Sequence, residues 1–185
     1  MTRPLHSRFG ILLCSVGAIV MALGTGTHLL PAQAPSAYEK AVLLKKPVAF
    51  WRLGEANGPE ILDKTSHRHI GTAHGSPRFK ALGAIKGDRD TAIKFDGNNS
   101  YIEIPSHKNF SQPTSGNGLT VEVWVRPDLL EFDGETDDTQ NPYIFWLGKG
   151  EPNQHEWALR FYSRKSADRS NRISAYIFNP DRHRG

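Results

Sequence analysis

Five carboxylates crowd residues 131–138, which makes this the densest group of side chains in the chain that could do chemistry. If the backbone there is extended, Glu131, Asp133 and Glu135 project from one face, because alternate residues of a strand share a face. Carboxylates grouped in this way could contribute to a cation site or form a solvated acidic loop. Gly134 and the loop-like residues that follow favour the solvated loop.

A second set of oxygen ligands lies at Asp96, Asn98 and Asn99, within four positions on a glycine-containing loop. Calcium takes about six to eight oxygen ligands, so this loop could supply only part of a site. Asp96 and Asn98 are the metal-ligand candidates, and a simple turn-forming role for these residues is the favoured alternative. We expect no required cofactor, and calcium is the one ion that the sequence leaves open.

Tryptophan offers a third kind of chemistry, because the C–H face of a sugar ring packs well on an indole. Trp146 and Trp157 flank a Gly-Lys-Gly-Glu loop at residues 148–151 and are the candidates for a ligand-binding platform. Burial in a core is the favoured alternative for this pair.

Three histidines, His67, His69 and His74, crowd one segment, and His67 and His69 could share a face of a strand. No carboxylate lies nearby at ligand spacing, so we interpret them as surface histidines. The sequence also lacks G-x-S-x-G, a glycine-rich phosphate loop and H-E-x-x-H.

The elements that must position these residues are almost all strands. The cleanest pattern is Leu119–Arg126, whose four aliphatic residues share one face. Residues 92–95 and 101–104 predict a β-hairpin around a loop of Asp, Gly and Asn. Further strands are predicted at 48–53, 143–147, 156–162 and 172–178, and a turn of helix across Tyr38–Leu44. Without a sustained helical period elsewhere, this pattern predicts an antiparallel sandwich or barrel.

Two of these strands have well-defined faces. Trp157, Leu159 and Phe161 share one face of the strand at 156–162. The strand at 172–178 likewise has an apolar face of Ile and Ala at residues 173, 175 and 177.

Residues 1–34 are typical of a secretory leader. Arg3 and Arg8 precede an apolar run, and an A-x-A site follows at residues 32–34. The sequence predicts export to the periplasm, the cell surface or the medium, either by a cleaved signal peptide or with residues 9–30 retained as a membrane anchor helix. The only cysteine, Cys14, lies in the leader, so the exported part can form no disulfide.

The charge balance excludes one class of partner. Removing the leader from the 185 residues leaves 151 residues, and loss of its two arginines lowers the formal charge from +4 to +2. That charge is too small to indicate a nucleic-acid-binding surface. The membrane is expected as a partner only through an uncleaved anchor.

Four motifs in order resemble LamG-like domains of the concanavalin A-like lectin/glucanase superfamily. Residues 47–55, PVAFWRLGE, resemble the family's opening strand AYWRLGE, and residues 92–97, AIKFDG, resemble its A-x-x-F-D-G hairpin. Residues 101–104, YIEI, resemble its return strand, and residues 119–127, LTVEVWVRP, resemble its T-V-E-x-W-V-R-P strand. The resemblance implies an all-β, antiparallel two-sheet jelly-roll sandwich. The family's later W-x-H-V and N-G segments are absent, which predicts an incomplete jelly roll.

The resemblance implies a domain layout and a function. We expect a leader at 1–34, an entry segment at 35–46, a partial LamG-like domain at 47–180 and a polar tail at 181–185. The function implied is non-catalytic binding of a glycan or a glycosylated surface. One alternative is a glycosidase, because the E-x-D-x-E spacing resembles lichenases of the same superfamily, where one Glu is the nucleophile and the other the acid/base. A structural or adhesive segment of a larger surface protein is the other alternative.

Overall fold

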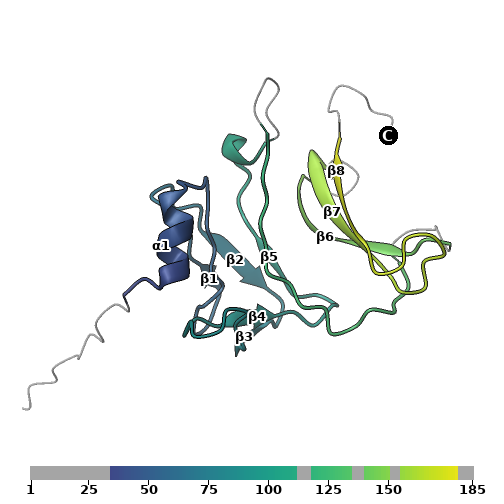
Figure 1. Cartoon of the computed structure of the whole chain (residues 1–185), viewed down its shortest axis with the longest axis horizontal. Helices are drawn as coiled ribbons and strands as arrows, with labels where there is room; N and C mark the ends of the chain where they lie inside the picture. Colours follow the sequence, from purple (N-terminus) through teal and green to yellow (C-terminus); the bar gives the residue numbers. More distant parts are fainter. Residues whose placement is uncertain (1–33, 112–117, 135–139, 151–154, 179–185) are drawn as a thin grey trace, which may run out of the picture. The chain divides into compact units, whose positions relative to one another are not determined.

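The computed structural model describes residues 34–111, 118–134, 140–150 and 155–178. The strands in these ranges form three small antiparallel sheets, which confirms the all-β prediction at the level of fold class (Figure 1). The predicted leader and polar tail lie outside the described residues, apart from Ala34. Within the described ranges, no helix is long and apolar enough to cross a membrane.

The expected helix is present as α1 (Ala37–Leu44). It begins at Ser36, whose hydroxyl accepts a hydrogen bond from the backbone N–H of Glu39 at 3.2 Å. This N-cap satisfies one of the donors that a helix leaves free in its first turn. The helix has no buried residue, so its cap and its side-chain contacts rather than a buried stripe hold it.

The first sheet has the strand order β1 (Glu60–Ile61), β2 (Gly71–His74) and β5 (Tyr101–Glu103). The second sheet pairs β3 (Arg78–Ala81) with β4 (Ala92–Lys94). The predicted hairpin between residues 92–95 and 101–104 is therefore wrong, because its two strands lie in different sheets. The segments GTAH and RFKA hold few typical strand formers, yet they become β2 and β3 and supply the backbone partners.

The strand predicted at residues 48–53 is reduced to one isolated bridge between Trp51 and Asp63. Leu53 has a φ of 60°, a left-handed conformation that ends extended structure for a residue with a side chain. The carboxylate of Asp63 accepts the backbone N–H groups of Phe50, Thr65 and His69. A side-chain carboxylate thus replaces part of the expected ladder.

The strand predicted at Leu119–Arg126 is also wrong, since these residues belong to no strand. Apolar alternation indicates which face of a strand is buried, but a strand forms only where a neighbouring backbone completes the ladder. No described residue supplies that neighbour, because no backbone group of residues 119–129 bonds to the backbone of another described residue.

The third sheet comprises β6 (Tyr143–Lys149), β7 (Trp157–Tyr162) and β8 (Ile173–Ile177), as the sequence predicts (Figure 1). Its registers place Trp157 opposite Ile177 and Phe161 opposite Ile173, so the two predicted apolar faces form one continuous face. Among the described residues, the deeply buried apolar side chains are Ile61, Ile93, Ala158 and Tyr162.

Candidate functional site

The other face of the third sheet gathers aromatic rings around an arginine. Ala158, Arg160 and Tyr162 alternate along β7 with the apolar residues, so they point to the opposite face. The register places Tyr143 opposite Tyr162 and Phe145 opposite Arg160 on β6, and Tyr176 opposite Ala158 on β8. We call this surface the arginine–tyrosine face, and it comprises Tyr143, Phe145, Arg160, Tyr162 and Tyr176.

Arg160 lies at the centre of this face. Its guanidinium carbon is 4.0 Å from the ring centroid of Tyr176, 4.3 Å from that of Tyr143 and 4.8 Å from that of Phe145. All three rings are within the range of cation–π attraction. The Arg160 side chain is half-buried, and within the described part of the chain its buried Nε has no hydrogen-bond partner. The rings therefore hold the guanidinium in place while one of its donors stays unused.

Two phenols and a second arginine border Arg160. The hydroxyls of Tyr162 and Tyr176 are 3.0 Å apart, and Arg169 donates to both, at 2.6 Å to Tyr162 and 3.3 Å to Tyr176. Burial alone would raise the pKa of Tyr162. Hydrogen bonds from Tyr176, Arg169 and Arg160 outweigh burial and lower that pKa below its usual value.

This arrangement is a fixed array of hydrogen-bond donors set among aromatic rings. Guanidinium and phenol groups donate to hydroxyl, carboxylate or sulfate oxygens, and half-exposed rings, here Tyr143, Phe145 and Tyr176, pack against apolar C–H surface. Tyr162 is buried. No described acidic side chain forms an ion pair with Arg160 or Arg169. The site has the chemistry for binding a polar ligand.

The sequence candidates Trp146 and Trp157 lie in the same sheet but not together on this face. Trp157 is on the apolar face, and its indole donates to the carbonyl of Phe110 at 2.7 Å. Trp146 lies at a register irregularity between Phe145 and Leu147, with its indole N–H buried and without a partner among the described atoms. Both indoles are half-buried, and a ligand role for them stays a prediction.

The Asp96 and Asn98 loop is held by hydrogen bonds of its own. One carboxylate oxygen of Asp96 accepts the backbone N–H groups of Asn98, Asn99 and Ser100 and the hydroxyl of Ser100. The Ser100 hydroxyl and these amides lower the pKa of Asp96 to about 2. This is the bonding of a turn, and a metal role for the two residues stays a prediction.

The acidic run is described only in part. Glu131 and Asp133 are exposed and belong to no strand, and Lys165 donates to the carboxylate of Asp133 at 2.8 Å. Glu135 lies outside the described residues. A catalytic role for the three carboxylates stays a prediction.

The predicted surface histidines separate into two groups. His74 stacks on Tyr101 at a centroid distance of 4.7 Å, whereas His69 lies 4.7 Å from His107 and 5.8 Å from His67. Burial, His107 and His67 lower the pKa of His69. Among the described residues, no group of three His, Cys, Asp or Glu side chains is arranged to hold a metal ion.

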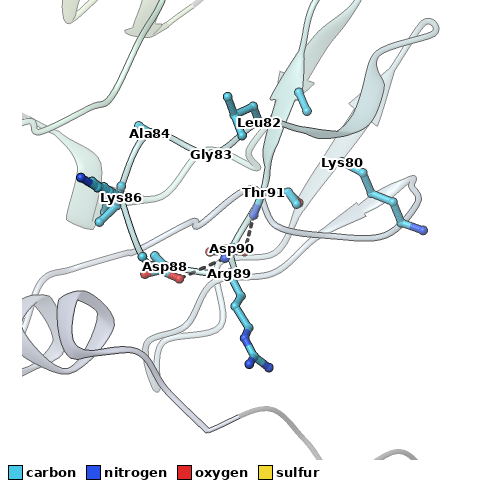
Figure 2. Close-up of a pocket in the computed structure, with 12 residues that line it drawn as sticks. Lys80, Leu82, Gly83, Ala84, Lys86, Asp88, Arg89, Asp90 and Thr91 are labelled. Carbon is cyan, nitrogen blue, oxygen red and sulfur yellow. Dashed lines mark hydrogen bonds between the residues drawn. The ribbon is translucent and has the colours of Figure 1, made fainter.

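A hollow of about 660 Å³ lies within the loop at residues 80–91 (Figure 2). Figure 2 shows the cationic ends of Lys80, Lys86 and Arg89 pointing in different directions, so they do not form a common anion site. The acidic residues of the loop instead hold Arg52, whose side chain is 7% exposed: Asp88 accepts from it at 2.8 Å and Asp90 pairs with it. The hollow is thus part of a structural ion-pair network.

The sequence interpretation missed Arg160, Arg169 and the tyrosines. The available signal was the alternation along β7. If Trp157, Leu159 and Phe161 share one face of the strand, then Ala158, Arg160 and Tyr162 must share the other. No family model, curated protein or solved structure matches the chain. The case for this site therefore rests on its geometry.

Proposed function

We propose that this chain is an exported, non-catalytic binding module that recognises a glycan or a glycosylated surface. In this proposal it has the two-sheet jelly-roll architecture of LamG-like domains. The order of the four sequence motifs supports the architecture, and the small antiparallel sheets agree with it at the level of fold class. Of the motif segments, those at residues 92–97 and 101–104 contain the strands β4 and β5, whereas Leu119–Arg126 forms none. Glycan binding then requires a surface that combines aromatic rings with fixed hydrogen-bond donors.

The arginine–tyrosine face is the observation that carries this proposal. Arg160 lies over three rings, and Arg169 donates to the hydroxyls of Tyr162 and Tyr176. The side chains are held before a ligand arrives, which reduces the entropy lost on binding. Sugar hydroxyls would accept from the guanidinium of Arg160 and the phenol of Tyr176, while their C–H faces contact ring edges.

The test is retention of the full chain on a panel of immobilised neutral and acidic polysaccharides, with and without EDTA. Tyr176→Phe removes one hydroxyl and keeps the ring, so retention by the recognised polysaccharide should weaken by about five- to tenfold. Arg160→Met should weaken it further. Arg164→Met, at an exposed loop position, is the matched control and should bind like the parent chain.

Three results are informative about the proposal. Failure of every polysaccharide to retain the parent chain would overturn it. Retention that neither Tyr176→Phe nor Arg160→Met weakens would move binding away from the arginine–tyrosine face. Loss of retention in EDTA would show that the predicted calcium contributes, whereas unchanged retention would show that it does not.

A further inference from the structure

The residues that resemble a strand but form none make up the 119–129 segment, Leu119–Leu129. Its apolar side chains are exposed to a degree unusual for an alternating strand sequence: Val123 is 45% exposed, Val125 52% and Trp124 62%. None of its backbone donors and acceptors bonds to the backbone of another described residue. Exposed apolar alternation with unpaired backbone groups is the usual template for pairing with a second strand.

Tyr38 of α1 contacts two side chains of this segment, Trp124 and Glu122. The indole of Trp124 donates to the hydroxyl of Tyr38 at 3.1 Å, and that hydroxyl donates to Glu122 at 3.3 Å. These contacts involve side chains, and no backbone group of the described residues bonds to the backbone of the segment. Figure 1 draws the segment as a plain tube without an arrow.

We propose that the 119–129 segment pairs antiparallel with the same segment of a second copy of the chain, in a two-fold register centred on Trp124. In this register Glu122 of each copy lies opposite Arg126 of the other, and Val123 lies opposite Val125. Both charged side chains are exposed, with Arg126 77% exposed, and their contacts within the chain are long: Arg126 lies 3.8 Å from Asp128, and Glu122 accepts from Tyr38 at 3.3 Å. A closer partner of opposite charge can replace them. The segment is thus complementary to itself in charge and in apolar character.

Other registers of this antiparallel pair are less favourable. A shift by one residue places the valine face of one copy against the polar face of the other, because side chains alternate with a period of two. A register centred on Val123 keeps the faces aligned but sets Glu122 opposite Trp124 and leaves Arg126 opposite Thr120. The Trp124-centred register is the one that pairs the whole of Leu119–Leu129 with itself, and it forms two symmetric pairs of Glu122 with Arg126.

Proline also fits this register. Pro127 lies opposite Val121 and has no N–H to donate. In an antiparallel ladder, hydrogen-bonded and non-hydrogen-bonded pairs alternate. If Pro127 occupies a non-hydrogen-bonded pair, Glu122 and Arg126 fall in a hydrogen-bonded pair. Val123 and Val125 then fall in a non-hydrogen-bonded pair, where side chains approach most closely.

The experiment is a charge exchange on the full chain, followed by light scattering coupled to size-exclusion chromatography over a range of concentrations. Glu122→Arg places arginine opposite arginine, and Arg126→Glu places glutamate opposite glutamate. Each single variant should weaken dimerisation by at least about tenfold, because like charges opposite each other destabilise and symmetry doubles the effect. An equimolar mixture of the two variants should restore the dimer, since each arginine then faces a glutamate.

Two matched controls keep the result specific. Glu131→Arg makes the same charge change at an exposed position outside the segment and should leave dimerisation unchanged. Tyr38→Phe removes the contact with Glu122 without changing charge and should also leave the dimer intact. Circular dichroism checks that every variant is folded like the parent chain.

A monomer at all concentrations would overturn the proposal. So would a dimer that both single variants leave unchanged, or single variants whose mixture does not recover. These outcomes are independent of glycan retention, because the 119–129 segment shares no residue with the arginine–tyrosine face.

Discussion

Replacement of Arg160 by methionine tests whether the three rings around the guanidinium stabilise the fold as well as the site. Methionine keeps most of the apolar stem and removes the charge and the planar group. The guanidinium carbon lies 4.0–4.8 Å from the centroids of Tyr176, Tyr143 and Phe145. Cation–π contacts of about 0.5–1 kcal/mol each give a predicted loss of about 1.5–3 kcal/mol in the free energy of unfolding.

Urea unfolding followed by far-ultraviolet circular dichroism measures this loss directly. For an m value of about 2 kcal/mol/M, a loss of about 2 kcal/mol lowers the unfolding midpoint by about 1 M. Arg160→Lys keeps the charge but not the stacked plane, so its midpoint should fall between those of Arg160→Met and the parent chain.

Arg164→Met is the control, because Arg164 is exposed and such substitutions usually change stability by less than about 0.5 kcal/mol. A midpoint for Arg160→Met equal to that of Arg164→Met would refute the reasoning. The rings would then lie near the guanidinium without stabilising it. Arg160 would not be held in place before a ligand binds.

Three further predictions concern the fold that carries the site. Hydrogen bonds from Ser36 and Arg52 lower the pKa of Asp88 to about 2. The ionised carboxylate should therefore stabilise the fold fully above pH 3.8, which is the pKa of Asp88 in the unfolded chain, and lose this effect as the pH falls toward 2. Over that interval the urea midpoints of the parent chain and Asp88→Asn should converge. Ile61 is fully buried, and Ile61→Ala should cost about 2–5 kcal/mol in the same urea assay, where a loss below about 1 kcal/mol would show that the first sheet has no real core there. Gly97 has a φ of 72° and open space where a Cβ would lie, so Gly97→Ala should lower the free energy of unfolding by about 1 kcal/mol through backbone strain alone. Gly118→Ala, which also enters open space, should lower it much less. Equal melting temperatures of the two variants would refute this.

The sequence predicted the third sheet well because its signals are local and mutually consistent. The alternation of Trp157, Leu159 and Phe161 indicates a strand, and the observed register places these residues on one face together with Ile173 and Ile177. The buried residues Ala158 and Tyr162 lie on the other face, whereas Ile173 is 50% and Ile177 65% exposed. The same local reasoning failed at the predicted hairpin. Whether β4 pairs with β5 or with β3 depends on which backbones meet in space, and the short polar segments that became β2 and β3 carry little strand signal.

The candidate site could be predicted only in part for a related reason. The side of β7 that carries Arg160 follows from alternation, but the rings above it come from β6 and β8. Their alignment depends on the registers and on the irregularity between Phe145 and Leu147, which no local pattern encodes. Trp146 and Trp157 are the ligand-binding candidates in the sequence because the C–H face of a sugar packs well on an indole. An arginine held between tyrosines has no comparable local pattern.

The 119–129 segment connects these successes and failures. Its alternation is the cleanest in the chain, yet it forms no strand, because alternation selects a face and cannot supply a partner. A sequence so regular, with Glu122 and Arg126 placed symmetrically about Trp124, is best explained if its backbone pairs with another strand. The charge exchange therefore tests more than an interface: recovery of the dimer in the mixture would show that the strand prediction was right about the segment and wrong only about where its partner lies.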